Sequence, residues 1–125
     1  MLMKIVEIIA RILLGLVFVV FGSNAFLHFI KMPPMSGPSG DFIMAMASTG
    51  YIYIVGFCQV AGGLLLLIGR YIPLGLTLLG PVIVNILCYH IFMDRQGLPI
   101  ALVVAVLALF LLWRHRGNFA GLLKQ

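Results

Sequence analysis

Apolar residues fill four long segments of the chain and leave only short polar segments between them. These segments cover residues 5–30, 51–68, 72–93 and 98–113. A helix needs about 20 residues to cross the hydrocarbon core of a membrane, and each segment has roughly that length. The strands of a membrane β-barrel alternate apolar and polar residues, whereas residues 101–113 are apolar on every face. The pattern predicts an all-α, integral membrane four-helix bundle that forms a single domain over residues 1–125.

The connection over residues 31–50 is much longer than the other two. Its first part is rich in proline, and Ser39 or Asp41 is placed to cap a short helix over residues 42–47. Gly50 is placed to end this connection before the second apolar segment. We therefore expect a short interfacial helix in the first outer loop, lying as a lid over the outer mouth of the bundle.

Composition supports the membrane assignment and charge adds an orientation. Of the residues, 63% are hydrophobic and 9% are charged, so the chain lacks the polar surface of a water-soluble globule. If both termini share one side, six cations lie there and two lie on the other, which predicts cytoplasmic termini by the positive-inside rule. The first group is Lys4, Arg11, Arg70, Arg114, Arg116 and Lys124, and the second is Lys31 and Arg95. The net charge of +5 is then a topology signal, and we expect a lipid bilayer and no nucleic acid as partner.

The first apolar segment follows Lys4 and has some features of a secretory signal. It is longer than such a signal, and no A-x-A-like cleavage site follows it. We expect it to be a retained helix. Glycines lie a heptad apart in the first two helices, Gly15 with Gly22 and Gly56 with Gly63, which predicts that helix backbones approach closely along these stripes.

Polar side chains gather in the outer half of the predicted bundle. Asn24 and His28 share a helix face, and Gln59 and Asn85 lie at a depth similar to that of Asn24. Such residues form either an amide network that holds the helices together or a pocket that holds a ligand. Interhelical hydrogen bonds average only about 0.6 kcal/mol in membranes, which favours the pocket. The candidate ligand-binding residues are Asn24, His28, Gln59, Asn85 and Tyr89.

Two further pairs of polar residues are spaced four apart. His90 and Asp94 share a different face from Asn85, and they form either an interfacial pair or a proton relay. Glu7 and Arg11 lie at the inner end of the first helix and can form an ion pair. Anchoring of the helix and a functional role are both open for this second pair.

Candidates for redox or metal chemistry are few. Cys58 and Cys88 would lie at similar depth, so a thiol pair stays open, although no C-x-x-C motif and no zinc-ligand spacing occur. The methionines near His28 have no diagnostic copper-ligand spacing, and the helical wheel turns His90 away from a haem between helices. We therefore predict no metal site and do not favour haem or copper. A quinone is the candidate cofactor, because amides can bind its carbonyl and aromatic rings can flank its plane.

Several short motifs occur in a familiar order along most of the chain. They are residues 11–18 followed by Phe21-Gly22, the sequence Thr49-Gly50-Tyr51 after the proline-containing loop, residues 59–69, and residues 81–93 with Asn85 and His90. In this order and spacing the chain resembles the DoxX family of small bacterial membrane proteins.

The resemblance implies a multi-pass protein of the bacterial inner membrane with four helices. DoxD-type relatives are subunits of a thiosulfate:quinone oxidoreductase, and other relatives are partners in membrane redox or detoxification assemblies. Many relatives carry glutamate where this chain has Gln59, so a proton-coupled role at that position is not carried over. We expect an accessory or binding subunit with an outer-half pocket for a quinone- or lipid-like ligand, with a membrane or periplasmic redox protein or a homo-oligomer as partner. The alternatives are a structural or chaperone-like subunit without ligand and a thiol- or quinone-dependent oxidoreductase.

Overall fold

The computed structural model describes residues 1–27 and 37–123, and this part of the chain is helical with no strand. The long helices are α1 (Leu2–Leu27), α3 (Tyr51–Ile68), α4 (Ile72–Phe92) and α5 (Leu98–Arg114). The shorter elements are α2 (Gly37–Thr49), α6 (Arg116–Phe119), η1 (Arg95–Gly97) and η2 (Ala120–Leu123). Four segments, the last of them Arg95–Arg114, are long and apolar enough to cross a membrane. The predicted four-helix membrane bundle is confirmed.

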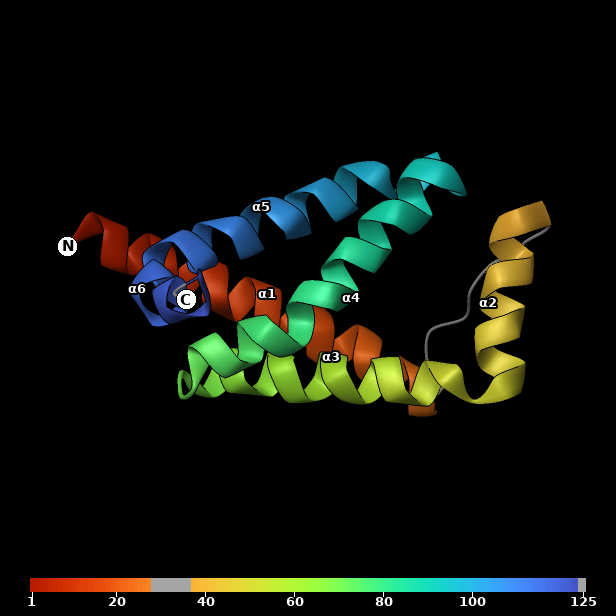
Figure 1. Ribbon diagram of the computed structural model, residues 1–125, viewed down its shortest axis with the longest axis horizontal. Helices are drawn as coiled ribbons and strands as arrows, with labels where there is room; N and C mark the ends of the chain where they lie inside the picture. The colour runs from red at the N-terminus through yellow and green to blue at the C-terminus, as the bar shows by residue number, and fades with distance from the viewer. Residues whose placement is uncertain (28–36, 124–125) are drawn as a thin grey trace.

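The four long helices pack as a ring in which each helix contacts two others. Helices α1 and α3 lie side by side and share the largest interface, α4 packs on α3, and α5 packs on both α4 and α1 (Figure 1). Helix α1 begins and α5 ends at the same end of the bundle, which we call the terminal end. The opposite end, where α2 stands, is the loop end.

Glycines allow the backbones of neighbouring helices to approach closely. A Cβ atom on Gly15 would lie 2.8 Å from the carbonyl oxygen of Gly63, and a Cβ on Gly22 would lie 2.9 Å from that of Gly56. Between α3 and α4, a Cβ on Gly62 would lie 3.1 Å from the carbonyl oxygen of Gly75. The close approach predicted from the glycine heptads is confirmed, because any side chain at these positions would meet backbone.

Buried apolar side chains of α1, α3 and α4 lie toward the terminal end and the middle of the bundle. In α1, α3 and α4 they lie near that end or in the middle of the helix: Ala10, Leu14, Phe18, Leu66, Ile72, Leu76, Leu79 and Ile83. Helix α5 also buries Ala101, Val104 and Ala105 toward the loop end. Helix α4 has no buried residue beyond Ile83. Figure 1 shows α4 running obliquely away from α3 toward the loop end, where it joins α5. The hydrophobic core therefore runs from the terminal end to the middle of α1 and α4, and α4 leaves it toward the loop end.

Helix α2 is the short loop helix expected from the sequence, but it is longer than residues 42–47. Ser39 and Asp41 lie within it, so the prediction that one of them caps its N-terminus is wrong. Gly50 separates α2 from α3 with a φ of 81°, a left-handed conformation that glycine adopts without strain. Helix α2 contacts α3 and stands across the loop end (Figure 1).

Candidate functional site

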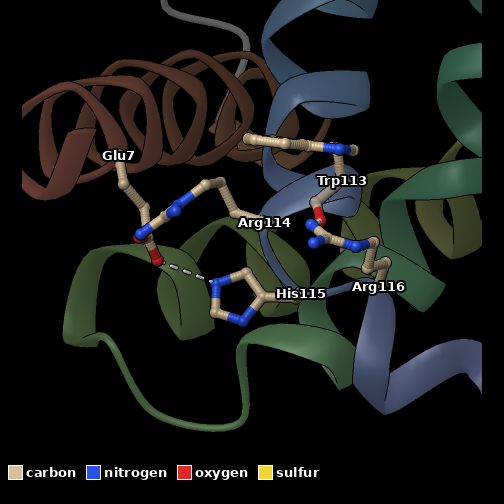
Figure 2. A network of polar contacts seen from close by, with 5 residues as sticks. All are labelled: Glu7, Trp113, Arg114, His115 and Arg116. Atoms are coloured by element: carbon tan, nitrogen blue, oxygen red, sulfur yellow. Dashed lines mark hydrogen bonds and ion pairs between the residues drawn. The ribbon is translucent and has the colours of Figure 1, made fainter.

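A charged network joins the first and last long helices at the terminal end. The guanidinium Nε of Arg114 donates a hydrogen bond of 3.1 Å to Oε2 of Glu7. Nε2 of His115 lies 3.0 Å from the other carboxylate oxygen, but without the alignment of a hydrogen bond (Figure 2). The Glu7 side chain is 19% exposed, so this network is partly shielded from solvent. We call Glu7, Arg114 and His115 the terminal clamp.

The expected ion pair between Glu7 and Arg11 does not form, because Glu7 contacts Arg114 and His115 instead. Glu7 contacts residues that follow it by more than 100 positions, and this proximity depends on how α5 packs on α1. Arg11 instead packs against the turn between α3 and α4, where a Cβ on Gly69 would lie 2.7 Å from its Nη1. Its buried Nε has no hydrogen-bond partner among the described residues.

Next to the clamp, Arg116 and Trp113 form an aromatic and cationic surface. The guanidinium of Arg116 lies 4.9 Å from the centroid of the Trp113 ring, and its Nη1 donates a hydrogen bond to the Trp113 carbonyl (Figure 2). An open, mostly apolar hollow of about 360 Å³ lies here, lined by Leu109, Leu112, Trp113, Arg116, Phe119 and Ala120. A tryptophan followed by basic residues at the end of an apolar segment is typical of a membrane interface. This signal at Trp113 could have predicted the surface from the sequence.

At the loop end, Gln59 points toward the middle of the bundle. Its direction on α3 lies between Gly63, which faces α1, and Gly62, which faces α4. Its Cβ lies 2.8 Å from the position that a Cβ on Gly22 would take. The side chain is half-buried, and its amide makes no hydrogen bond with any described residue.

Of the other candidates near Gln59, Asn24 is half-buried on α1, and His28 lies outside the described residues. Asn85 is exposed, about 200° around α4 from the buried Ile83. The structure therefore does not bring Asn85 together with Gln59. The sequence placed both at similar depth, but depth does not determine which side of α4 faces the bundle.

Tyr89 links α4 to α2 at the loop end. Its ring centroid lies 5.6 Å from that of Phe42, and the Ser39 side chain hydrogen-bonds with it. A second aromatic contact at the same end joins Phe26 of α1 to Tyr53 of α3, whose ring centroids lie 5.4 Å apart. Two aromatic contacts thus lie at the same end of the bundle as Gln59.

His90 and Asp94 meet, but through the backbone. Nδ1 of His90 lies 2.9 Å from the carbonyl oxygen of Asp94, so we assign the proton to this nitrogen as the donor. The Asp94 carboxylate accepts a hydrogen bond from the backbone N–H of Gln96 and so caps η1. The carboxylate–imidazole contact expected of a relay is absent from these two residues.

Cysteine and metal candidates can also be placed. Cys58 is half-buried on α3, Cys88 is exposed on α4, and both are free thiols. In the part of the chain that the structure describes, no group of three or more histidine, cysteine or acidic side chains could hold a metal ion.

A family model and one relative match most of the chain. A model of the DoxX family matches residues 6–94. The chain is also similar to "Uncharacterized protein YwoB" of Bacillus subtilis (strain 168), with 31% identity over 98 residues. That match covers 74% of this chain and 64% of the relative, which is less than two thirds of the relative's length. No solved structure matches the chain.

Proposed function

The chain belongs to the DoxX family of multi-pass membrane proteins, and we propose that it is a binding subunit of a membrane redox system. In this proposal the loop half of the bundle holds a quinone- or lipid-like ligand, with Gln59 as the polar contact. The redox assignment is supported by the family resemblance, and the ligand site is supported by the surroundings of Gln59.

The unpaired amide of Gln59 is the observation that carries the proposal. Gln59 lies eight residues into α3, about 12 Å along the helix, which places it within the hydrocarbon core. An amide at that depth is costly unless it finds a hydrogen-bond partner, and lipid tails supply none. A carbonyl oxygen of a quinone or of a lipid ester would accept the N–H groups of this amide.

Packing in the loop half is consistent with a ligand site. Helices α1 and α3 approach closely beside Gln59 through Gly22 and Gly56, whereas α4 has no buried residue beyond Ile83 and so packs less closely at this end. Phe26, Tyr53 and Tyr89 supply aromatic surface at that end. Helix α2, tied to α4 through Phe42, would separate the ligand from bulk water.

We place the terminal end in the cytoplasm of a bacterial cell, with the bundle in the inner membrane. Five described cations lie at or near the terminal end, namely Lys4, Arg11, Arg70, Arg114 and Arg116. Arg95 lies at the loop end together with the acidic Asp41 and Asp94. This asymmetry follows the positive-inside rule, and it would open the ligand site toward the outer leaflet.

Native mass spectrometry of protein extracted from its own membranes in mild detergent tests the ligand site. We expect the wild-type protein to retain a small molecule with the mass of a quinone or lipid, and Gln59→Leu to lose it. Gln96→Leu makes the same chemical change at an exposed position in η1, away from Gln59, and should retain the ligand. Equal ligand occupancy in wild type and Gln59→Leu would show that Gln59 does not bind it.

The structural alternative makes the opposite prediction. If the polar residues only hold the helices together, the wild-type protein carries no specific ligand, and Asn24 substitutions lower its thermal stability. Asn24 does have an interaction in the structure, which keeps this alternative open for that residue. Gln59 has no such interaction, so the ligand proposal rests on Gln59 alone.

A further inference from the structure

Helix α4 carries a heptad pattern of exposed residues on the side away from the bundle. Leu74, Pro81 and Cys88 are spaced seven apart, and so are Asn85 and Phe92. All five are exposed, and together they form a continuous line along α4 that we call the heptad stripe. Thr77, Val84 and Ile91 repeat with the same spacing beside it, so the spacing defines the line, and the case for a partner helix comes from Asn85.

Asn85 distinguishes this stripe from an ordinary lipid-facing surface. It lies thirteen residues after Ile72, about 20 Å along a helix that crosses a hydrocarbon core of about 30 Å. Its exposed amide makes no hydrogen bond with any residue that the structure describes. Lipid tails offer no donor or acceptor at this depth, so the amide calls for a partner from another helix.

We propose that a second copy of this chain packs on the heptad stripe, α4 against α4, with the two Asn85 amides hydrogen-bonded to each other. Two copies inserted in the same direction and related by a two-fold axis along the membrane normal place both Asn85 residues at the same depth. The amide carries both donors and an acceptor, so it is complementary to itself. A different protein would need its own polar group at that depth, whereas a second copy supplies it by symmetry.

The neighbours of Asn85 favour close packing of two α4 helices. Pro81 and Cys88, one turn to either side along the stripe, are compact residues that let the two backbones approach. No residue of the stripe is charged, so two copies meet without repulsion between like charges. Gln59 lies on α3 and points into the bundle, so each copy keeps its own ligand site and the dimer does not depend on the proposed function.

Cross-linking in vesicles of phosphatidylethanolamine and phosphatidylglycerol tests the geometry, because Cys88 lies on the stripe and Cys58 does not. Two Cys88 thiols that meet across the axis would form one disulfide, passing two electrons to copper(II) phenanthroline and releasing two protons. We expect Cys58→Ser to form a covalent dimer as readily as wild type, and Cys88→Ser to form none.

The contribution of Asn85 is measured by the dimer fraction at increasing dilution in the same vesicles. Asn85→Leu should raise the dimer dissociation constant about three- to eightfold, because one or two interhelical amide hydrogen bonds of about 0.6 kcal/mol each are lost. Val84→Leu changes an exposed neighbour at the same depth outside the stripe and should leave the dissociation constant unchanged. Both variants should keep the wild-type melting temperature of the monomer, which shows that any change does not come from misfolding.

Four results would overturn the proposal. They are a protein that stays monomeric at all densities, a dimer linked only through Cys58, a dimer fraction unaffected by Asn85→Leu, and a Cys88 cross-link to another protein in native membranes. Loss of the ligand in Gln59→Leu with an unchanged dimer would support both proposals separately. Absence of any ligand would leave the dimer test intact.

Discussion

The two ends of this bundle are built by different interactions. At the terminal end, Glu7 of α1 contacts Arg114 and His115 across a long sequence separation, and the buried core lies close by. At the loop end, α4 and α5 run away from α1 and α3, and α2 stands across the opening (Figure 1). There Gln59 points inward without a hydrogen-bond partner in the described part of the chain.

This difference separates what stabilises the fold from what is available for binding. In the terminal clamp, Glu7 and Arg114 form a hydrogen-bonded ion pair, and the His115 ring lies against the same carboxylate, as expected of a structural network. The amide of Gln59 is not satisfied within the described chain, and such unpaired polar groups at membrane depth are typical of functional positions. We infer that the terminal end provides the rigid frame and that the loop end provides the adaptable site.

The largest loss of stability is expected from a substitution that pushes α1 and α3 apart. In Gly63→Ala the new Cβ would lie 2.8 Å from the carbonyl oxygen of Gly15 and 3.0 Å from the backbone nitrogen of Val19. Backbone cannot move aside as a side chain can, so the free energy of unfolding should fall by about 2–3 kcal/mol. Thermal unfolding in detergent measures this loss.

Gly80→Ala is the matched control for that prediction. A Cβ on Gly80 would meet nothing within 4 Å, so the stability should stay unchanged or rise slightly. Equal losses in the two variants would show that the α1–α3 contact is not as close as the structure has it.

A smaller effect is expected from breaking the terminal clamp alone. Glu7→Gln removes the charge that Arg114 and His115 share, and we expect a loss of about 1–2 kcal/mol because the pair is only partly buried. Asp41→Asn removes an exposed carboxylate on α2 and should change the stability by less than about 0.5 kcal/mol. If both variants unfold at the same temperature, the clamp contributes nothing to the frame.

A local effect is expected from untying α2 from α4. Phe42→Ala removes the ring that packs on Tyr89, which should cost about 0.5–1.5 kcal/mol and speed amide hydrogen exchange in α2. Exchange in α1 and α3 should not change, because their interface does not depend on α2. Met44→Ala, at a position 67% exposed on the same helix, is the control. Faster exchange throughout the bundle would mean that the two ends are not independent.

The smallest effect on stability is expected at the residue that carries the proposed function. Gln59→Leu replaces an unpaired amide by an apolar side chain, so the ligand-free protein should be as stable as wild type or up to about 1 kcal/mol more stable. Thermal unfolding of delipidated protein measures this. A clear loss of stability would instead favour the structural alternative, in which Gln59 holds helices together.

Much of the fold could be predicted from the sequence because hydrophobic length determines which segments span a membrane. The expected bounds 51–68 and 72–93 agree with α3 (Tyr51–Ile68) and α4 (Ile72–Phe92) to within a residue. The site could be predicted less well. A spacing of four residues suggested that Glu7 pairs with Arg11. Such local spacing does not show that α5 places Arg114 next to Glu7.

The sequence by itself determined the solvent, the number of spanning helices and the close glycine contacts, because these depend on local length, hydrophobicity and residue size. Tertiary structure alone decided which polar groups meet. It paired Glu7 with Arg114 and His115, turned Asn85 away from the bundle, and pointed Gln59 toward its middle. The physical reason is that depth along a helix is readable from residue count, whereas the direction of a side chain becomes meaningful only once the neighbouring helices are in place.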